Sequence, residues 1–267
     1  MTIGTKVIKL NARNILKTYI APCFFAGLIF LFSYFGFYML CSIFAYINMQ
    51  TFAGLLLYAI IIFIISPLFL GLLRFYWRLT FDEFDNPISI FYYMSDKKLY
   101  FKAIKLIFSL ALKLIFRIAL YMLPAIIISV LVSQPFYAAF DISMPLWVGY
   151  LSHIKNGLIV LCLIIAFLSM LRYYLSPILF VINDTIDIDE ATNMSSIISK
   201  KSATDFIYLF LSLVFWIIAS VFVLPLIFTI PYFCLCYIVH SKNAIAEYNA
   251  HIQAINDINN NNYFEGI

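Results

Sequence analysis

Long apolar runs without any charge constrain this chain more than any other feature of its sequence. No charged residue occurs between Pro22 and Ile47, or between Thr51 and Leu73. Both runs exceed the roughly 18 residues that indicate a membrane-spanning helix. In the whole chain 64% of the residues are hydrophobic and 11% are charged, whereas a soluble domain is about half apolar and a quarter charged. The sequence therefore predicts an all-α, polytopic integral membrane protein.

The number of spans depends on the last of five apolar blocks. That block, Phe206–Val239, is too long for one ordinary span and short for two. Pro225 near its middle favours a tight helical hairpin, because proline interrupts a helix. We therefore expect six transmembrane helices in three hairpins; a single long, kinked last helix, which gives five spans, is the alternative. The other predicted spans are Pro22–Ile47, Thr51–Leu73, one within Phe101–Gln134, and Ile154–Ile182.

The basic residues predict the orientation of the chain. Lys and Arg concentrate before the first predicted span and after the second and fourth, whereas the segments after the first and third contain almost none. Because basic segments stay in the cytoplasm, the N-terminus is predicted to be cytoplasmic. The segment before the first span mixes apolar residues with cations, which is typical of an interfacial amphipathic helix on an anionic leaflet. Its cations are Lys6, Lys9, Arg13 and Lys17.

Two stretches of the sequence resemble each other. Ser66-Pro67 and Ser176-Pro177 each lie in an apolar run that leads into an acidic segment and then a Lys-Lys pair. The correspondence predicts two parallel repeats, roughly 51–134 and 154–239, within a single transmembrane domain over 1–256. Chance similarity is the alternative, since Ser-Pro is common in apolar runs and a Lys pair is expected at a cytoplasmic boundary. Helix kinks are expected at Pro67, Pro124, Pro177 and Pro225.

Four cations between positions 102 and 117 fall on one face of a predicted helix, since they and Ser109 recur every three or four residues. Arg172 lies in another predicted span, and no Asp or Glu occurs in any predicted span to pair with these cations. One interpretation is a site for an anionic lipid or ligand. The alternative is an interfacial helix whose cations reach the headgroups. The candidate binding residues are Lys102, Lys105, Lys113, Arg117 and Arg172.

No residue pattern predicts a catalytic centre, a metal site or a cofactor. The sequence has no HExxH motif, no P-loop and no nucleophile elbow around a serine. All five cysteines lie in apolar runs, where we expect small buried hydrophobes rather than disulfides. The acidic segments are expected to balance nearby lysines. Nothing indicates nucleic-acid binding, and residues 257–267 are predicted to form a disordered polar tail.

The second of the two similar stretches carries a family resemblance. With Ser176-Pro177, Asp184, Trp216 and Pro231-Tyr232 as landmarks, it resembles the C-terminal half of an uncharacterised family of small polytopic bacterial membrane proteins. The run from Ile65 to Leu79 resembles the first half of the same family. The resemblance implies a six-helix protein of the bacterial cytoplasmic (inner) membrane. It brings no established reaction and no catalytic residues.

From these patterns we expect a non-enzymatic membrane protein that binds anionic lipid or an acidic partner at its cytoplasmic side. A role in membrane assembly, protection or envelope stress would fit such binding. A small permease or permease subunit for an anionic or amphipathic substrate is one alternative. An intramembrane enzyme of unrecognised type is the other. The expected partners are the lipid bilayer, its anionic lipids, and a membrane protein or a second copy of the chain.

Overall fold

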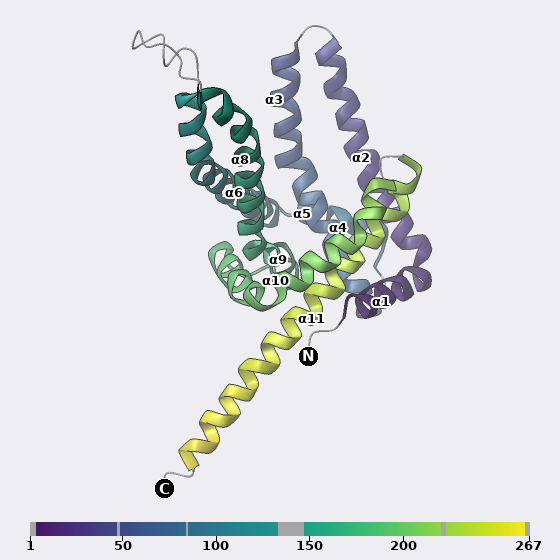
Figure 1. Cartoon of the computed structure of the whole chain (residues 1–267). Helices are drawn as coiled ribbons and strands as arrows, with labels where there is room; N and C mark the ends of the chain where they lie inside the picture. The colour runs from purple at the N-terminus through teal and green to yellow at the C-terminus, as the bar shows by residue number, and fades with distance from the viewer. Residues whose placement is uncertain (1–3, 47–48, 84, 133–146, 220–222, 265–267) are drawn as a thin grey trace. The chain divides into compact units, whose positions relative to one another are not determined.

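The computed structural model describes residues 4–46, 49–83, 85–132, 147–219 and 223–264, and these ranges contain helices and no strand (Figure 1). The first part of the chain forms α1 (Thr5–Thr18), α2 (Ile20–Tyr46), α3 (Gln50–Ile60), the π-helical turn η1 (Ile61–Ile65) and α4 (Ser66–Leu79). A short 3-10 helix η2 (Pro87–Phe91), α5 (Tyr92–Ser95) and the long α6 (Lys97–Leu131) follow. The second part comprises α8 (Trp147–Met170), η3 (Leu171–Tyr173), α9 (Ser176–Ile182), α10 (Ile188–Ala219) and α11 (Val223–Phe264).

Five stretches of helix in the described ranges are long and apolar enough to cross a membrane. They are Ile20–Tyr46, Gln50–Leu79, Lys97–Leu131, Lys155–Ile182 and Ile188–Ile218. Many of their large apolar side chains are exposed; Phe32 of α2 is 72% exposed and Phe167 of α8 is 60% exposed. Such surfaces are favourable in hydrocarbon and unfavourable in water. The described ranges are thus helical, as predicted, and five of their helical stretches are compatible with a membrane protein.

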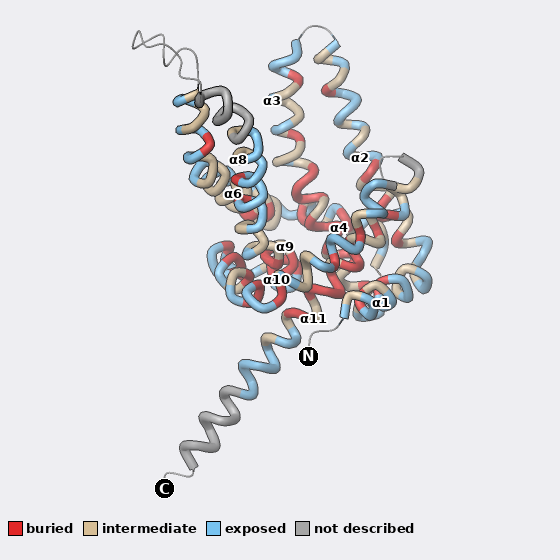
Figure 2. Tube along the Cα trace, in the orientation of Figure 1, coloured by how far each residue is buried: buried red, intermediate tan, exposed pale blue. Residues whose placement is uncertain are grey.

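The chain divides into two compact units. One unit is Phe108–Arg172, which contains the later part of α6 and α8; the other combines residues 1–107 with 173–267. In the second of these units the buried residues concentrate in α4, α9 and the middle of α11 (Figure 2). Leu70, Leu72 and Phe75 of α4 are at most 1% exposed, because α4 is covered by η2, α9, α11 and α2. α4 is therefore the central helix of this unit.

The contact between α4 and η2 requires a glycine. A Cβ atom on Gly71 would lie 1.8 Å from the backbone oxygen of Ile90, which no packing adjustment of a side chain can relieve. Asn86 begins η2 by accepting a hydrogen bond from the backbone N–H of Ile88 at 3.1 Å, and Pro87 fits the first helical position. The segment after α4 thereby folds back onto the helix that precedes it.

Both Ser-Pro pairs begin a short α-helix after an irregular segment. Ser66 follows the π-helical turn η1, and its hydroxyl donates to the backbone oxygen of Ile61 at 2.8 Å. Ser176 follows the 3-10 segment η3, and here the backbone N–H of Leu175 donates to the Ser195 hydroxyl at 3.1 Å. Side chains thus satisfy backbone groups that proline and the irregular turns release.

The other two prolines for which kinks are predicted lie elsewhere in their helices. Pro124 is inside the continuous helix α6, and Pro225 lies in the first turn of α11, where its missing N–H needs no helical partner. A further proline, Pro231, is inside α11. The helix α11 runs on to Phe264 and so includes most of the segment for which the sequence predicts disorder.

Candidate functional site

Asp184, just after α9, is the centre of a polar network that joins four segments of the chain. Its Oδ2 accepts from Arg74 of α4 at 2.5 Å and from the hydroxyl of Tyr92 at 3.0 Å. Its Oδ1 accepts from the hydroxyl of Tyr93 at 2.7 Å. The guanidinium of Arg74 also lies 3.4 Å from the centre of the Tyr92 ring, a cation–π geometry. The carboxylate is therefore held by three donors from α4 and α5.

This environment acts on the two tyrosines. Burial and the neighbouring Asp184 carboxylate raise the pKa of Tyr93, and the same two causes raise the pKa of Tyr92. Both hydroxyls therefore stay protonated and act as donors to the carboxylate. Tyr93 is fully buried and its ring stacks on Phe180 of α9, with the ring centres 5.4 Å apart. The arrangement is a rigid structural joint rather than an open acid–base site.

Lys102 of α6, one of the candidate binding residues, is part of the same network. Its ammonium donates to the backbone oxygens of three successive residues, Asp184, Thr185 and Ile186, at 2.9, 3.1 and 3.4 Å. An ammonium has three N–H donors, so these three oxygens account for all of them. The structure thus uses Lys102 to hold the segment that follows α9.

Two further contacts connect segments that the sequence predicts to be cytoplasmic. The hydroxyl of Tyr19, between α1 and α2, donates to Asp82 at 3.0 Å, and the hydrogen bond raises the pKa of Tyr19. Lys242 of α11 donates to the backbone oxygen of Thr80 at 3.2 Å and lies 3.7 Å from the centre of the Phe81 ring. We call the set of contacting residues the polar layer. It consists of Tyr19, Arg74, Thr80, Asp82, Tyr92, Tyr93, Lys102, Asp184 and Lys242.

The acidic segment after α4 is balanced by an arginine. Arg78 donates from Nε to Glu83 at 3.1 Å and from its terminal nitrogen to Asp85 at 2.7 Å. All three side chains are partly exposed, which screens their attraction. Like the pair of Arg74 with Asp184, these ion pairs use arginine, whereas the sequence predicts that lysines balance the acidic segments.

The remaining candidate binding residues lie in different surroundings. Lys105 is exposed in the unit that contains the polar layer. Lys113 is half-buried and Arg172 is exposed, both in the other unit. There, Arg117 donates to the backbone oxygen of Ser169, in the last turn of α8, at 2.5 Å. A cation at the C-terminal end of a helix interacts favourably with the negative end of the helix dipole.

A buried histidine cluster lies between α9, α10 and α11, and the sequence offers no obvious partner for this histidine. His240 Nε2 and the hydroxyl of Tyr174 are 2.9 Å apart, and the Tyr174 hydroxyl is 2.8 Å from that of Ser202. Phe206 stacks on the Tyr174 ring with the centres 4.4 Å apart. Burial lowers the pKa of His240 to about 4, against the opposing effects of Asp205 and the Ser202 backbone. His240 is therefore neutral at pH 7.

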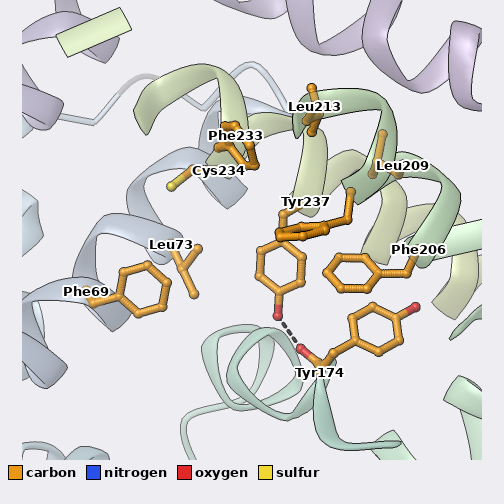
Figure 3. A pocket seen from close by; sticks show the side chains of 10 residues that line it. Phe69, Leu73, Tyr174, Phe206, Leu209, Leu213, Phe233, Cys234 and Tyr237 are labelled. Atoms are coloured by element: carbon orange, nitrogen blue, oxygen red, sulfur yellow. Dashed lines mark hydrogen bonds between the residues drawn. The ribbon is translucent and has the colours of Figure 1, made fainter. Parts of the chain in front are cut away.

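An apolar pocket of about 350 Å³ adjoins this cluster (Figure 3). Its walls come from α4, α10 and α11 together with Tyr174. Tyr237 of α11 donates its hydroxyl hydrogen to the backbone oxygen of Tyr174 and so connects two of the walls. In Figure 3 the hydroxyl of Tyr174 points away from Phe69 and Leu73, so the polar end of this ring is directed out of the pocket. The described walls of the pocket therefore offer mainly hydrophobic contact.

The helix α1 presents three of its four cations outward. Ile8 and Ala12 are buried, because α1 packs on α11 and α2. Lys6, Arg13 and Lys17 are exposed, and they share the outer surface with exposed apolar side chains. The fourth cation of the helix, Lys9, donates to the backbone oxygen of Ser212 in α10 at 2.9 Å. The exposed apolar side chains of α1 beside the three exposed cations belong to Val7 and Leu10.

A second and larger pocket, of about 770 Å³, opens between α1, α10 and α11. Arg13 and Leu16 line it from α1, Trp216 from α10, and Phe228 and Tyr232 from α11; Pro225 completes the wall. The rings of Trp216 and Tyr232 are in contact, with their centres 5.8 Å apart. The sequence predicts Arg13 to be a cation of an interfacial helix, but no sequence pattern brings it together with these aromatic residues.

A third, smaller pocket of about 300 Å³ lies on the other side of α1, where Asn11 and Asn14 face Lys242 and Asn243 of α11. The Nδ2 atom of Asn243 is buried there without a hydrogen-bond partner among the described residues. Loss of hydration lowers the pKa of Lys242, and the charge of Asp82 opposes this effect. The pocket has several polar side chains in its lining and borders the polar layer at Thr80 and Lys242.

Within the described ranges no group of three His, Cys, Asp or Glu side chains lies in an arrangement that could hold a metal ion. The five cysteines are all buried and unpaired. Comparison with known proteins adds no further evidence on function: no family model, no curated protein and no solved structure matches this chain.

Proposed function

We propose that this chain is a non-enzymatic membrane protein that binds anionic lipid at its cytoplasmic side. The observation that carries the proposal is the surface of α1. Its buried residues Ile8 and Ala12 fix the helix against the rest of the protein, and its exposed cations stand beside exposed apolar side chains. An anionic leaflet supplies a partner for both, since its headgroups attract cations and its acyl boundary accepts apolar groups.

In this proposal the chain enters the membrane from the cytoplasmic side as three hairpins, α2 with α3–α4, α6 with α8–α9, and α10 with α11. The third hairpin does not reach the opposite face, because Lys9 of the cytoplasmic helix α1 donates to the backbone oxygen of Ser212, near the tip of that hairpin. The polar layer supports the arrangement, because it joins segments from the base of each hairpin. Tyr19 before α2 bonds to Asp82 after α4, and Lys242 late in α11 bonds to the carbonyl of Thr80. Segments in hydrogen-bond contact lie on the same membrane face, and the positive-inside rule makes that face cytoplasmic.

The internal use of acidic residues also supports the proposal. Asp184 forms an ion pair with Arg74, and Glu83 and Asp85 form ion pairs with Arg78. The helix α1 has four cations and no acidic residue between Thr5 and Thr18. Its charge is therefore balanced from outside its own sequence, and a juxtamembrane cation contributes about 1 kcal/mol to binding an anionic surface. The same surface would suit an acidic membrane-protein partner, which the test below separates from lipid.

Spin-labelled lipids test the proposal. The protein is reconstituted in phosphatidylcholine vesicles with a trace of spin-labelled phosphatidylglycerol or phosphatidylcholine, and the immobilised fraction of each is measured by electron spin resonance. Phosphatidylglycerol should associate more strongly, and the preference should weaken as salt is added. Lys6→Gln with Lys17→Gln should reduce the preference by roughly threefold or more.

Lys200→Gln with Lys201→Gln is the matched control, because it removes the same charge from exposed positions on α10. This control should keep most of the preference for phosphatidylglycerol. Equal association of the two lipids with the parent protein would overturn the proposal, and so would an equal loss in the two double variants.

A further inference from the structure

The pocket between α1, α10 and α11 is built from residues that each match one part of a phospholipid. Arg13 supplies a guanidinium at its rim, and Trp216, Phe228 and Tyr232 supply aromatic walls. A guanidinium offers planar, paired donors that match the oxygens of a phosphodiester. Trp and Tyr favour the level of the headgroups, where one end of the ring is apolar and the other is wet. The pocket thus combines a cationic group with an apolar wall, as a phospholipid combines an anionic headgroup with apolar chains.

The register of α1 on α10 holds Arg13 at this place. Lys9 and Arg13 are four residues apart on α1, as are Ser212 and Trp216 on α10, so each pair shares a helix face. Lys9 is anchored at the backbone oxygen of Ser212 at 2.9 Å, and Arg13 lies one turn further, at Trp216. The hydrogen bond of Lys9 therefore fixes the position of α1 that directs Arg13 to the pocket.

The guanidinium of Arg13 is available to an anion from outside the chain. Arg13 is exposed and forms no ion pair with an acidic side chain in the part of the chain that the structure describes. Lys9, the neighbouring cation on the same helix face, donates to a backbone carbonyl, so its partner is a neutral group and not an anion. A volume of about 770 Å³ exceeds what a free phosphate ion needs and accommodates a headgroup with the upper part of an acyl chain.

We infer that this pocket binds one anionic phospholipid, with its phosphodiester on Arg13 and an acyl chain along Phe228 and Leu16. The inference rests on the proposed function and goes further, because it assigns a single lipid site in place of general attraction to a charged surface. Trp216 and Tyr232 contact the lipid at the junction of its headgroup and chains. Occupancy by this lipid joins α1 to the α10–α11 pair.

Quenching of tryptophan fluorescence by brominated lipid tests the site directly, because bromine quenches only at contact distance. The chain has three tryptophans, and Trp77→Phe with Trp147→Phe leaves Trp216 as the single reporter. This variant is reconstituted with equal mole fractions of brominated-chain phosphatidylglycerol or phosphatidylcholine. We expect stronger quenching by phosphatidylglycerol, and Arg13→Gln should abolish the difference between the two lipids while quenching by phosphatidylcholine remains.

Two further variants separate this inference from the proposed function. Arg13→Lys should restore part of the difference, since an ammonium keeps the charge and loses the paired geometry. Lys17→Gln removes one charge from the same helix outside the pocket and should leave the difference intact. Equal quenching by the two lipids, or a difference that survives Arg13→Gln, would overturn the single site. If spin-labelled lipid still shows selectivity in that case, only the site is wrong and the proposed function stands.

Discussion

Arg74 and Asp184 occupy equivalent positions in the two similar stretches of the chain and form an ion pair with each other at 2.5 Å. Arg74 follows Pro67 by seven residues, and Asp184 follows Pro177 by seven. The helices that carry the two prolines, α4 and α9, also pack on each other. Contact between equivalent residues and equivalent helices is what an approximate twofold axis between two parallel repeats would produce. Opposite charges at matched positions let the two halves bind without repulsion.

The first prediction concerns this ion pair. Asp184→Asn should lower the free energy of unfolding by about 3 kcal/mol, because it leaves the half-buried Arg74 and two tyrosine hydroxyls without their charged acceptor. The free energy is measured by titration with sodium dodecyl sulfate while helical circular dichroism is followed. Glu83→Gln, which touches only the exposed part of the Arg78 pair, should cost less than about 1 kcal/mol. Equal losses in the two variants would show that Asp184 has no special role.

The second prediction concerns Gly71. Gly71→Ala should destabilise the protein by about 3 kcal/mol or more, because the added methyl group would lie 1.8 Å from the Ile90 oxygen and force α4 and η2 apart. Gly54→Ala on α3 is the matched control, since nothing lies within 4 Å of its Cβ position. That change should be neutral or stabilising by up to about 1 kcal/mol. A Gly71→Ala protein as stable as the parent would refute the packing of η2 on α4.

The third prediction follows from the buried histidine. The unfolded chain takes up a proton on His240 near its ordinary pKa of 6.5, whereas the folded protein does so only near 4. The unfolded state therefore binds more protons between these values, and stability is lost as the pH falls through this window. The full effect is about 3 kcal/mol. The groups facing His240 are Tyr174, Ser202 and Asp205.

His240→Gln should flatten this pH dependence, as measured by thermal unfolding in detergent from pH 7 to pH 4. The exposed His251→Gln variant serves as the control and should retain the slope of the parent protein. A parent protein whose stability does not change between pH 6.5 and pH 4 would contradict the burial of a neutral His240.

The fourth prediction separates two lysines of the basic ridge. Lys102→Met should destabilise the protein by about 1 to 2 kcal/mol, since three backbone oxygens after α9 lose their charged donor. Lys105→Met, three residues further on the same helix, is exposed and should change stability by less than about 0.5 kcal/mol. The comparison is made by the same detergent titration. If Lys105→Met were the more damaging change, the assignment of Lys102 as a structural cation would be wrong.

The sequence predicts those features that depend on local patterns. Uncharged runs longer than a membrane is thick predict the apolar helices. The kinks predicted at Pro67 and Pro177 fall where irregular turns precede helices that begin at Ser66 and Ser176. The mixture of cations and apolar residues before Ile20 predicts the amphipathic helix α1. Each of these features is decided by neighbours within a few turns of the same helix.

The sequence does not reveal features that depend on distant partners. Lys102 belongs by spacing to a ridge of cations, yet its acceptors are backbone oxygens 82 to 84 residues away. Backbone oxygens carry no sequence signal, so no pattern could have identified them. His240 likewise meets Tyr174 across 66 residues. The count of spans, the repeats and the uncharacterised family remain predictions.

The most direct test of the whole account is the sidedness of the polar layer. Single cysteines are introduced at four exposed positions in a variant whose native cysteines are replaced by alanine, and sealed vesicles of both orientations are treated with a membrane-impermeant maleimide. The positions are Lys17, Asp96, Asn193 and Glu247, one for each segment proposed to lie at the cytoplasmic face. All four should react only where that face is exposed. Reaction of any one of them from the opposite face alone would contradict the account.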